Sequence, residues 1–571
     1  QDMNQITEKH PQPQFAREKI FFLNGEWDIV FNGREKQKIR VPYCVESELS
    51  GVGYKGFIHS CRYSRTFVLP EQMRGDRVFL CFGAVSNVAN VFVNGKQAGG
   101  HRGAYTPFRM DVTDLLQEGE NHVEVDVRND LTDRNPTGKQ SAKENSFGCF
   151  YTRCTGIWQS VWLEAVPETH LTAVRFYPSA KQGSVKIEVR SNGCADLQAE
   201  VLFGGKIVGT YAAKLYHAAS FTLPLKEKHL WEVGKGDLYE VVLRFGQDTV
   251  YSYFGLRDAE YRGLDFLLNG KSVFQRLVLD QGYYPEGVYT PASEGEFAAD
   301  IQRAVELGFN GARLHQKLFD PRYLYECDKR GFLVWGEYAS WGVNYFTLDS
   351  FGQFVGEWRE AVERDFNHPC IVTWCPLNET WGELDDDSKQ RDVRFVDGIY
   401  AVTKALDPTR PCVDVSGGMH GAKTDVADYH CYDGYDVLKD RLDKAARGEM
   451  DFLNMYLPGE GNAYRGEPQN LSEFGGVSFG GASIEQTQCV EETTAWGYTS
   501  ASDEDTFVGN YERTARLILG YKNLSGFCYT QLYDIEQEQN GLYTYERRPK
   551  FSEQGMRRIR EANLTKAASE E

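Results

Sequence analysis

Residues 309–338, FNGARLHQKLFDPRYLYECDKRGFLVWGEY, decide the fold. FNGARLH at the start and FLVWGEY at the end are short apolar runs that finish in polar residues, as buried strands do. The stretch DPRYLYECDKRG between them is predicted to be a helix. A strand, a helix and a second strand in this order predict a parallel sheet with its helices packed outside.

The same alternation extends on both sides of this stretch. The preceding segment SEGEFAADIQRAVELG (293–308) has a serine start signal and apolar residues at helical spacing. The apolar strand candidates are 273–280, 309–315, 332–338, 370–379, 411–417, 425–432, 470–476 and 526–534. Eight such strands separated by helical stretches predict a C-terminal (β/α)8 TIM barrel, whose active site lies where the strands end.

Strands separated by turns fill the chain before the barrel. Asn-Gly and Gly-Gly turn signals with β-branched and aromatic runs predict an N-terminal β-sandwich over residues 1–167. A shorter β-rich region, 168–258, has the length of an immunoglobulin-like β-sandwich. The barrel is then expected over 259–571, which gives a multidomain chain of three parts.

Composition excludes several classes of partner. With 571 residues, the chain is too long for one ordinary core, and its net charge of −19 argues against nucleic acid. No apolar run approaches the ~20 residues of a membrane span. The chain begins QDMNQITEKH, without Met, so we expect a periplasmic or secreted protein, although a cytoplasmic location stays open. A homo-oligomer also stays open.

The sequence gives no sign of a cofactor. Its 13 cysteines are an odd number without CxxC pairs or a Cys/His cluster at zinc spacing, so neither a disulfide framework nor a metal is expected. Cys370, Cys375, Cys412 and Cys431 lie in apolar segments and are interpreted as core residues. There is no glycine-rich phosphate loop, so no nucleotide cofactor is implied.

Two carboxylates end strands that face one another across the predicted barrel. Glu379 ends the fourth strand candidate in WCPLNETWG (374–382), and Glu473 ends the seventh in NLSEFGG. Such a pair can hydrolyse a glycoside, one as proton donor to the leaving oxygen and the other as nucleophile on the anomeric carbon. The alternative is that both are ordinary solvated charges at strand ends.

The whole chain resembles glycoside hydrolase family 2, which contains β-galactosidases, β-glucuronidases and β-mannosidases. LNGEWDIVFNG, VFVNGKQAGGHRGAYTPFRMDVTDLL and GIWQSVWLE are similar to its N-terminal sugar-binding-type jelly roll. FNGARLH, HPCIVTWCPLNE, LSEFGG and NGLYTYERRPK are similar to its barrel signatures. The resemblance implies that Glu379 is the acid/base and Glu473 the nucleophile of a retaining double displacement.

The resemblance also implies substrate-binding roles at other strand ends. Asn378 would bind the sugar 2-hydroxyl, and Arg313 would keep the nucleophile ionised. Trp374 and Trp381 would wall the site and raise the pKa of Glu379 by desolvation. Tyr432 matches a tyrosine that donates to the nucleophile.

Five further residues at strand ends are expected to bind substrate: His315, His430, Asp280, Glu337 and Trp341. His430 lies two residues before Tyr432, and His315 two after Arg313, so each pair shares one strand face. A satisfied core histidine is the alternative for His430 and His315. Trp341 is either a stacking platform for sugar or a core residue.

Three departures from the family pattern concern the sugar. No lysine follows Asn540-Gly541 at the spacing with which β-glucuronidases grip the substrate carboxylate, which puts glucuronide specificity in doubt. Thr530 and Gln531 stand where the family often has Trp at the end of the eighth strand. The magnesium ligands of the large galactosidases are not recognisable.

The loops 146–156 and 453–470 are expected to reach or wall the pocket.

These observations predict an exo-acting retaining β-glycosidase, with β-galactosidase as the first expectation because it is the commonest neutral activity of the family. Arabinofuranosidase, galactofuranosidase, mannosidase and uronidase activities are alternatives. A carbohydrate-binding protein without catalysis is an alternative from another class.

Overall fold

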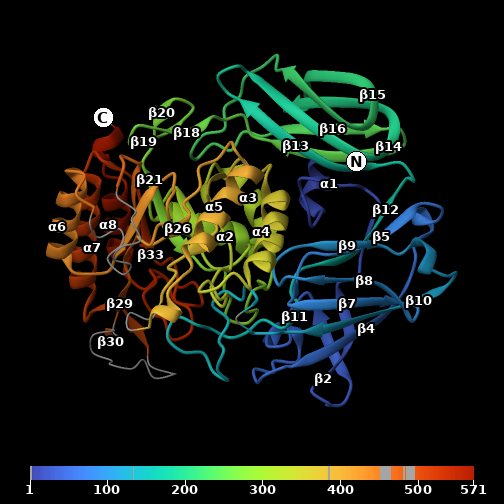
Figure 1. Ribbon diagram of the computed structural model, residues 1–571, viewed down its shortest axis with the longest axis horizontal. Coiled ribbons are helices and arrows are strands. Elements are labelled where there is room, and N and C mark those ends of the chain that lie inside the picture. The colour runs from blue at the N-terminus through green and yellow to red at the C-terminus, as the bar shows by residue number, and fades with distance from the viewer. Residues whose placement is uncertain are drawn as a thin grey trace.

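The structure is a computed structural model of the chain (Figure 1). It describes residues 3–132, 134–382, 386–450, 464–479, 482–483 and 495–570. Most of the predicted loop 453–470 therefore lies outside the described residues.

The first domain is a β-sandwich, drawn in blue in Figure 1. One sheet is built from β1 (Ile20–Phe22), β12 (Val161–Val166), β5 (Arg77–Phe82) and β9 (Phe108–Asp111). The other is built from β3 (Gln37–Val41), β2 (Gly25–Phe31), β4 (Ser60–Val68), β10 (Glu120–Arg128), β7 (Val88–Val93) and β8 (Lys96–Arg102). Strict alternation places Val123, Val125 and Val127 of β10 in the core between them. A short pair, β6 (Val85–Ser86) with β11 (Gly156–Ile157), lies at one end.

The second domain is a smaller β-sandwich, drawn in green. Its strands are β13 (Leu171–Ser179), β14 (Ser184–Phe203), β15 (Lys206–Pro224), β16 (Tyr239–Phe245) and β17 (Asp248–Phe254), all antiparallel. The N-terminal helix α1 (Met3–Lys9) contacts β17, and Ala16 pairs with Tyr251 of the same strand. The first residues of the chain therefore pack against this second domain as well as the first.

Parallel strands form the predicted barrel. One sheet contains β24 (Ile371–Cys375), β23 (Leu333–Glu337), β22 (Gly311–Leu314), β21 (Gln275–Asp280), β33 (Leu524–Thr530), β28 (Gln469–Gly475) and β27 (Ala427–Cys431). The ring closes through β25 (Leu377–Asn378), which pairs with β26 (Val415–Ser416), and β26 contacts β27. All eight predicted strand positions are confirmed.

Helices cover the outside of this ring. They are α2 (Gly295–Glu306), α3 (Pro321–Arg330), α4 (Phe351–Asp365), α5 (Val393–Leu406), α6 (Tyr435–Ala446), α7 (Glu504–Leu519) and α8 (Glu553–Asn563). Local chemistry sets the ends of α3: the Asp320 side chain accepts from the Arg322 amide, Pro321 takes the first helical position, and Gly331 ends the helix with φ +64°. No helix in the described ranges is long and apolar enough to cross a membrane.

Short strands complete the third domain. β18 (Ala259–Arg262), β19 (Asp265–Leu268) and β20 (Lys271–Ser272) lie at the amino ends of the barrel strands, where Tyr261 accepts a hydrogen bond from Gln275. Beyond β28, β29 (Val477–Phe479) pairs with β32 (Thr499–Ala501), and β30 (Ala482–Ser483) with β31 (Trp496–Gly497). The cysteines of the described segments are free thiols, and the four interpreted as core residues are buried.

Candidate active site

Glu379 and Glu473 meet at the carboxyl ends of the barrel strands. One oxygen of each carboxylate and a ring nitrogen of His430 lie within 4.8 Å of one another. Glu473 is 4% exposed, and the side chain of Glu379 is 13% exposed. The barrel thus brings together two carboxylates that lie 94 positions apart in the sequence, at hydrogen-bonding distance from one histidine.

Arg313 holds the Glu473 side of the pair. It is fully buried at the end of β22, and its Nη1 donates to Glu473 Oε1 at 3.1 Å. Nε and Nη2 donate to the two oxygens of Glu337 at 2.8 Å each. Burial opposes its charge, but the two carboxylates outweigh burial and hold the pKa of Arg313 well above its ordinary value. A permanent cation is thus in direct contact with the Glu473 carboxylate.

Tyr432 gives Glu473 a second donor. Its hydroxyl donates to Glu473 Oε2 and lies 2.9 Å from the Thr530 hydroxyl. Its ring stacks on Tyr498 with centroids 3.6 Å apart. The predicted contact between Tyr432 and Glu473 is confirmed, whereas Tyr498 follows a stretch whose pattern gave no indication of the site.

His430 stands between the two carboxylates. Its Nδ1 lies 2.7 Å from Glu379 Oε2 and 3.2 Å from Glu473 Oε2, within hydrogen-bonding distance of both carboxylates. Its Nε2 lies 2.9 Å from the Ser416 hydroxyl, which donates to Asp428 at 2.6 Å. Burial lowers the pKa of His430, but the charges of Glu473 and Glu379 outweigh it and raise the net value. His430 belongs to the site and is not an isolated core histidine.

The prediction for the indoles and the pKa of Glu379 is wrong. Burial does raise this pKa, but the hydrogen bond and charge of His430 outweigh burial and hold it below the ordinary value. Trp374 lies in the core, where it donates to Asp407 at 2.8 Å and packs edge-on against Trp358 of α4. Trp381 is 43% exposed and lies 3.3 Å from Glu379 as a hydrogen-bond donor, which lowers the pKa further.

The backbone fixes the direction of Glu379. Its φ is +40°, a conformation that is uncommon outside glycine, and its amide donates to the Ser416 carbonyl at 2.9 Å. Asn378, the preceding residue, accepts from Arg313 through Oδ1 at 3.1 Å. Its buried Nδ2 has no partner within the described residues, so the donor expected to bind a sugar hydroxyl is available.

The other predicted substrate-binding residues divide into two groups. His315 and Trp341 line the mouth: the Trp341 indole donates to the Asn378 carbonyl at 2.9 Å, and the rings lie 6.4 Å apart. Burial holds the pKa of His315 well below its ordinary value, and its Nδ1 has no hydrogen-bond partner in the described chain. Glu337 is buried against Arg313, so the structure places it behind the site as a support.

The structure does not join Asp280 to the two carboxylates. Its oxygens accept from Tyr323 at 3.0 Å, from the Gly282 amide at 2.9 Å and from Tyr533. Two phenols and an amide account for this buried carboxylate as a structural group. Its assignment to a sugar hydroxyl has no support here.

A loop of the first sandwich reaches the barrel, as predicted for 146–156. Tyr151 donates to Glu538 and accepts from Gln281 at 3.2 Å, and Phe150 lies 5.5 Å from Trp341 between ring centroids. The contact begins earlier than predicted, because the amides of Thr137 and Gly138 donate to the Trp341 carbonyl at 3.1 and 3.0 Å. Lys139 follows these two residues and was not indicated by any sequence motif.

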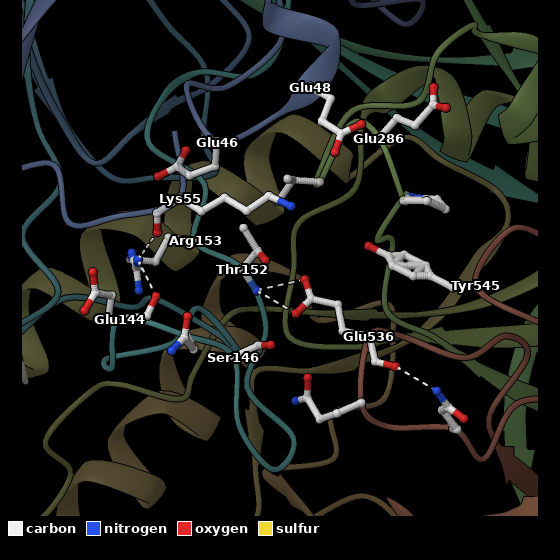
Figure 2. A pocket seen from close by; sticks show the side chains of 15 residues that line it. Glu46, Glu48, Lys55, Glu144, Ser146, Thr152, Arg153, Glu286, Glu536 and Tyr545 are labelled. Carbon is white, nitrogen blue, oxygen red and sulfur yellow. Dashed lines mark hydrogen bonds between the residues drawn. The ribbon is translucent and has the colours of Figure 1, made fainter. Parts of the chain in front are cut away.

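The same loop also lines a cavity. This cavity has a volume of about 400 Å³ and is lined by Glu46, Lys55, Arg153, Glu536 and Tyr545, among others (Figure 2). Thr152 donates its amide to Glu536 there at 3.1 Å. Tyr151 and Thr152 thus both contact the loop that follows β33, through Glu538 and Glu536.

The polar end of the eighth strand is present as the sequence indicated. Gln531 donates to Asn540 at 2.7 Å and accepts from Gln281 at 2.7 Å, while Asn540 donates to Glu538 at 3.2 Å. These amides form a hydrogen-bonded floor in place of an indole. Glu538 was not predicted, because nothing in its surrounding sequence marks a strand end.

Two groups of side chains have the spacing of metal ligands. The first is Glu379, His430 and Glu473. In the second, Asp328 accepts from Tyr253 at 2.6 Å and from the Cys370 amide at 3.0 Å, with His368 at 2.6 Å. Hydrogen bonds account for both arrangements, and we assign neither to a metal.

Comparisons with known proteins agree with this geometry. The family model described as glycosyl hydrolase 2 galactose-binding domain-like matches residues 35–160, and the family 2 TIM barrel domain matches 292–560. A β-galactosidase of Thermoanaerobacterium thermosulfurigenes is 27% identical over 433 residues, which are 70% of this chain and 56% of that protein. A β-glucuronidase of Pongo abelii is 24% identical over 539 residues, 86% of this chain and 79% of that protein.

Solved structures with the same fold are similar over nearly the whole chain. A β-galacturonidase of Eisenbergiella tayi bound to galacturonate has a TM-score of 0.74 at 22% identity and covers 97% of this chain and 99% of that one. A β-glucuronidase of Ruminococcus gnavus in complex with D-glucuronic acid has a TM-score of 0.78 at 18% identity, with 98% and 100% covered. By contrast, the chain spans only about half the length of the Thermoanaerobacterium relative.

Proposed function

Because the chain belongs to glycoside hydrolase family 2, we propose that it is a retaining β-glycosidase that removes a terminal sugar by double displacement. The observation that carries the proposal is the pair Glu379 and Glu473, whose oxygens lie within 4.8 Å. Retaining enzymes hold their two carboxyl groups about 5–5.5 Å apart, whereas inverting enzymes need about 6.5–9.5 Å to admit a water. The short separation supports retention.

Glu473 is proposed as the nucleophile because a guanidinium and a phenol both donate to its carboxylate. Arg313 and Tyr432 both donate to it, and neither can accept a proton from it under ordinary conditions. Attack of a Glu473 oxygen on the anomeric carbon forms the glycosyl ester as the bond to the leaving oxygen breaks. Asn378, whose Nδ2 is available, is proposed to bind the neighbouring sugar hydroxyl.

Glu379 is proposed as the acid and then the base. It gives a proton to the leaving oxygen in the first step and takes one from the attacking water in the second. Once Glu473 is esterified, its negative charge within 4.8 Å of Glu379 is gone. Loss of a neighbouring like charge favours ionised Glu379, which is the form that a base requires.

The glycone is proposed as either a galactoside or a uronide. The relatives quoted above include a β-galactosidase and a β-glucuronidase, and the solved structures are a β-glucuronidase in complex with D-glucuronic acid and a β-galacturonidase bound to galacturonate. β-Galactoside remains a candidate as the neutral activity first expected. The uronide is favoured by the position of Lys139.

A panel of nitrophenyl glycosides tests the proposal. It includes the β-galactopyranoside, β-galacturonide, β-glucuronide, β-mannoside, α-L-arabinofuranoside and β-galactofuranoside, each with wild type and Glu473→Ala. Proton NMR of the first-formed product should show retained configuration at the anomeric carbon. Sugar binding without turnover by wild type would instead favour a carbohydrate-binding protein.

A further inference from the structure

We propose that Lys139, supplied by the first sandwich, binds a carboxylate on the glycone, so that the enzyme is selective for β-linked uronic acids. This inference rests on the proposed glycosidase function and adds the substrate class and the residue that selects it. The family feature that would grip such a carboxylate, a lysine after Asn540-Gly541, is absent from this sequence. Lys139 lies on a different domain and in a different element.

The backbone around Lys139 is fixed to the barrel. The amides of Thr137 and Gly138 donate to the Trp341 carbonyl, and the Lys139 carbonyl accepts from Tyr151 at 2.8 Å. Gly138 has φ +62°, and a Cβ there would lie 2.4 Å from the Gln316 carbonyl oxygen. Only glycine allows this approach, so Lys139 begins from a defined point beside the barrel mouth.

The ammonium group lies beside Trp341 and Tyr151 at the barrel mouth. Lys139 is 5% exposed, and its Nζ lies 5.1 Å from the centroid of Trp341 and 5.8 Å from that of Tyr151. Its charge contributes to lowering the pKa of both Glu379 and His315, after burial and other larger causes. The cation therefore lies within electrostatic reach of the place where the sugar must sit.

The Lys139 ammonium has no hydrogen bond or ion pair to any residue that the structure describes. Other buried lysines differ. Lys317 donates to the carbonyls of Gly282 and Tyr289 at 2.5 and 2.9 Å, and Lys550 pairs with Asp534 at 2.8 Å. The neighbouring cation Arg313 is already engaged by Glu337 and Glu473.

An ammonium group held against the rings of Trp341 and Tyr151, with no acceptor among the described residues, can bind an anionic group of a ligand. A uronic acid supplies a carboxylate, which forms a charge-assisted bond, whereas the hydroxymethyl group of a neutral hexose supplies only a hydroxyl. The site would then use Arg313 for its own nucleophile and Lys139 for the substrate. Two cations of the pocket thus have separate tasks.

The test compares kcat/KM for nitrophenyl β-galacturonide, β-glucuronide and β-galactoside in wild type, Lys139→Met and Lys143→Met. Lys143 is an exposed lysine of the same loop and is the matched control. We expect wild type to prefer a uronide, and Lys139→Met to lower kcat/KM for that uronide about 10- to 100-fold. Activity on the galactoside should change less than about threefold, and Lys143→Met should behave as wild type. The two uronides differ only at C4 and identify the sugar.

Several outcomes would overturn the inference while leaving the proposed function intact. One is a wild type that cleaves the galactoside as well as either uronide. Another is an equal loss on all substrates in Lys139→Met with a shifted pH profile, which would assign Lys139 to the electrostatics of Glu379. If wild type cleaves nothing, the proposed function fails, and calorimetric binding of free D-galacturonate, D-glucuronate and D-galactose decides. Tighter uronate binding that Lys139→Met removes would support the inference, and equal binding of acid and neutral sugar would refute it.

Discussion

The two carboxylates of the site share one histidine but have different surroundings. Glu473 is held by Arg313 and Tyr432 on the barrel strands, deep in the ring. Glu379 has backbone φ +40° and is contacted by His430 and by the half-exposed Trp381. A nucleophile must stay ionised and in place, whereas an acid/base must exchange its proton with a leaving group and with water. The difference in donors supports the proposed roles.

The largest effect should come from substitution of Glu473, which Arg313 and Tyr432 hold in place. Glu473→Ala removes the nucleophile, and we expect turnover of the preferred aryl glycoside to fall about 10⁵-fold. Hydrolysis is followed by nitrophenol release, with azide added in a parallel assay to yield the glycosyl azide of inverted configuration. Glu553→Ala, on the exposed face of α8, is the control. Activity within tenfold of wild type would reassign the nucleophile.

A smaller effect is expected from substitution of Glu379, the more exposed of the two carboxylates. Glu379→Ala should lower kcat/KM, which reports the first step, about 10²- to 10⁴-fold for poor leaving groups and much less for nitrophenol, since a good leaving group needs no proton. The measurement is a series of aryl glycosides with leaving groups of increasing pKa. A loss that is the same across the series would contradict the assignment of Glu379 as the acid.

The pH profile tests the residue that joins the two sides. His430→Gln removes the charge that lowers the pKa of Glu379 and leaves the raising effect of burial, so this pKa should rise. Glu379 then stays protonated to higher pH, and the basic limb of kcat/KM should move to higher pH, with a loss of about tenfold at the optimum. A basic limb that moves to lower pH would show that His430 does not control this proton.

The smallest effect should come from the loop that carries Lys139. Gly138→Ala puts a Cβ 2.4 Å from the Gln316 carbonyl at φ +62°, and the strain of about 1–3 kcal/mol should displace Trp341 and Lys139. We expect a severalfold loss of kcat/KM on the preferred substrate with an unchanged pH profile. Gly148→Ala is the matched control, because its φ is +53° but nothing lies within 4 Å of its Cβ position. Equal losses in both variants would mean that the close approach at Gly138 does not matter.

The barrel strands and their polar ends could be predicted because local sequence pattern encodes them. Each barrel strand is an apolar run with a polar end, which is why Glu379 and Glu473 were predicted to face one another, while the roles of Arg313 and Tyr432 were implied by the family resemblance. Strand alternation also explains the error at Trp374: its side chain packs on Trp358 of α4, so it leaves the strand on the helix side. Trp374 was predicted at the site because it lies close to Glu379 in the sequence, although closeness in sequence does not place two side chains on the same side of a strand.

The remaining parts of the site depend on contacts between distant segments. Lys139 lies in a loop with neither helical nor strand period, and its place follows from hydrogen bonds to Trp341, more than 200 positions later. Glu337 was predicted at a strand end, but only the fold shows that Arg313 donates to both its oxygens. Only the fold shows, likewise, that Tyr323, Tyr533 and the Gly282 amide donate to Asp280.

The hydrogen bonds from Thr137 and Gly138 to Trp341 have an evolutionary consequence. They make the first sandwich a part of the pocket wall, while the residues proposed to break the glycosidic bond all lie on the barrel. With the proposed role of Lys139, a substitution in this loop of the first domain can therefore change the preferred sugar. No catalytic residue has to change. We expect that exchanging this loop between relatives transfers the specificity for one sugar and leaves the catalytic residues unchanged.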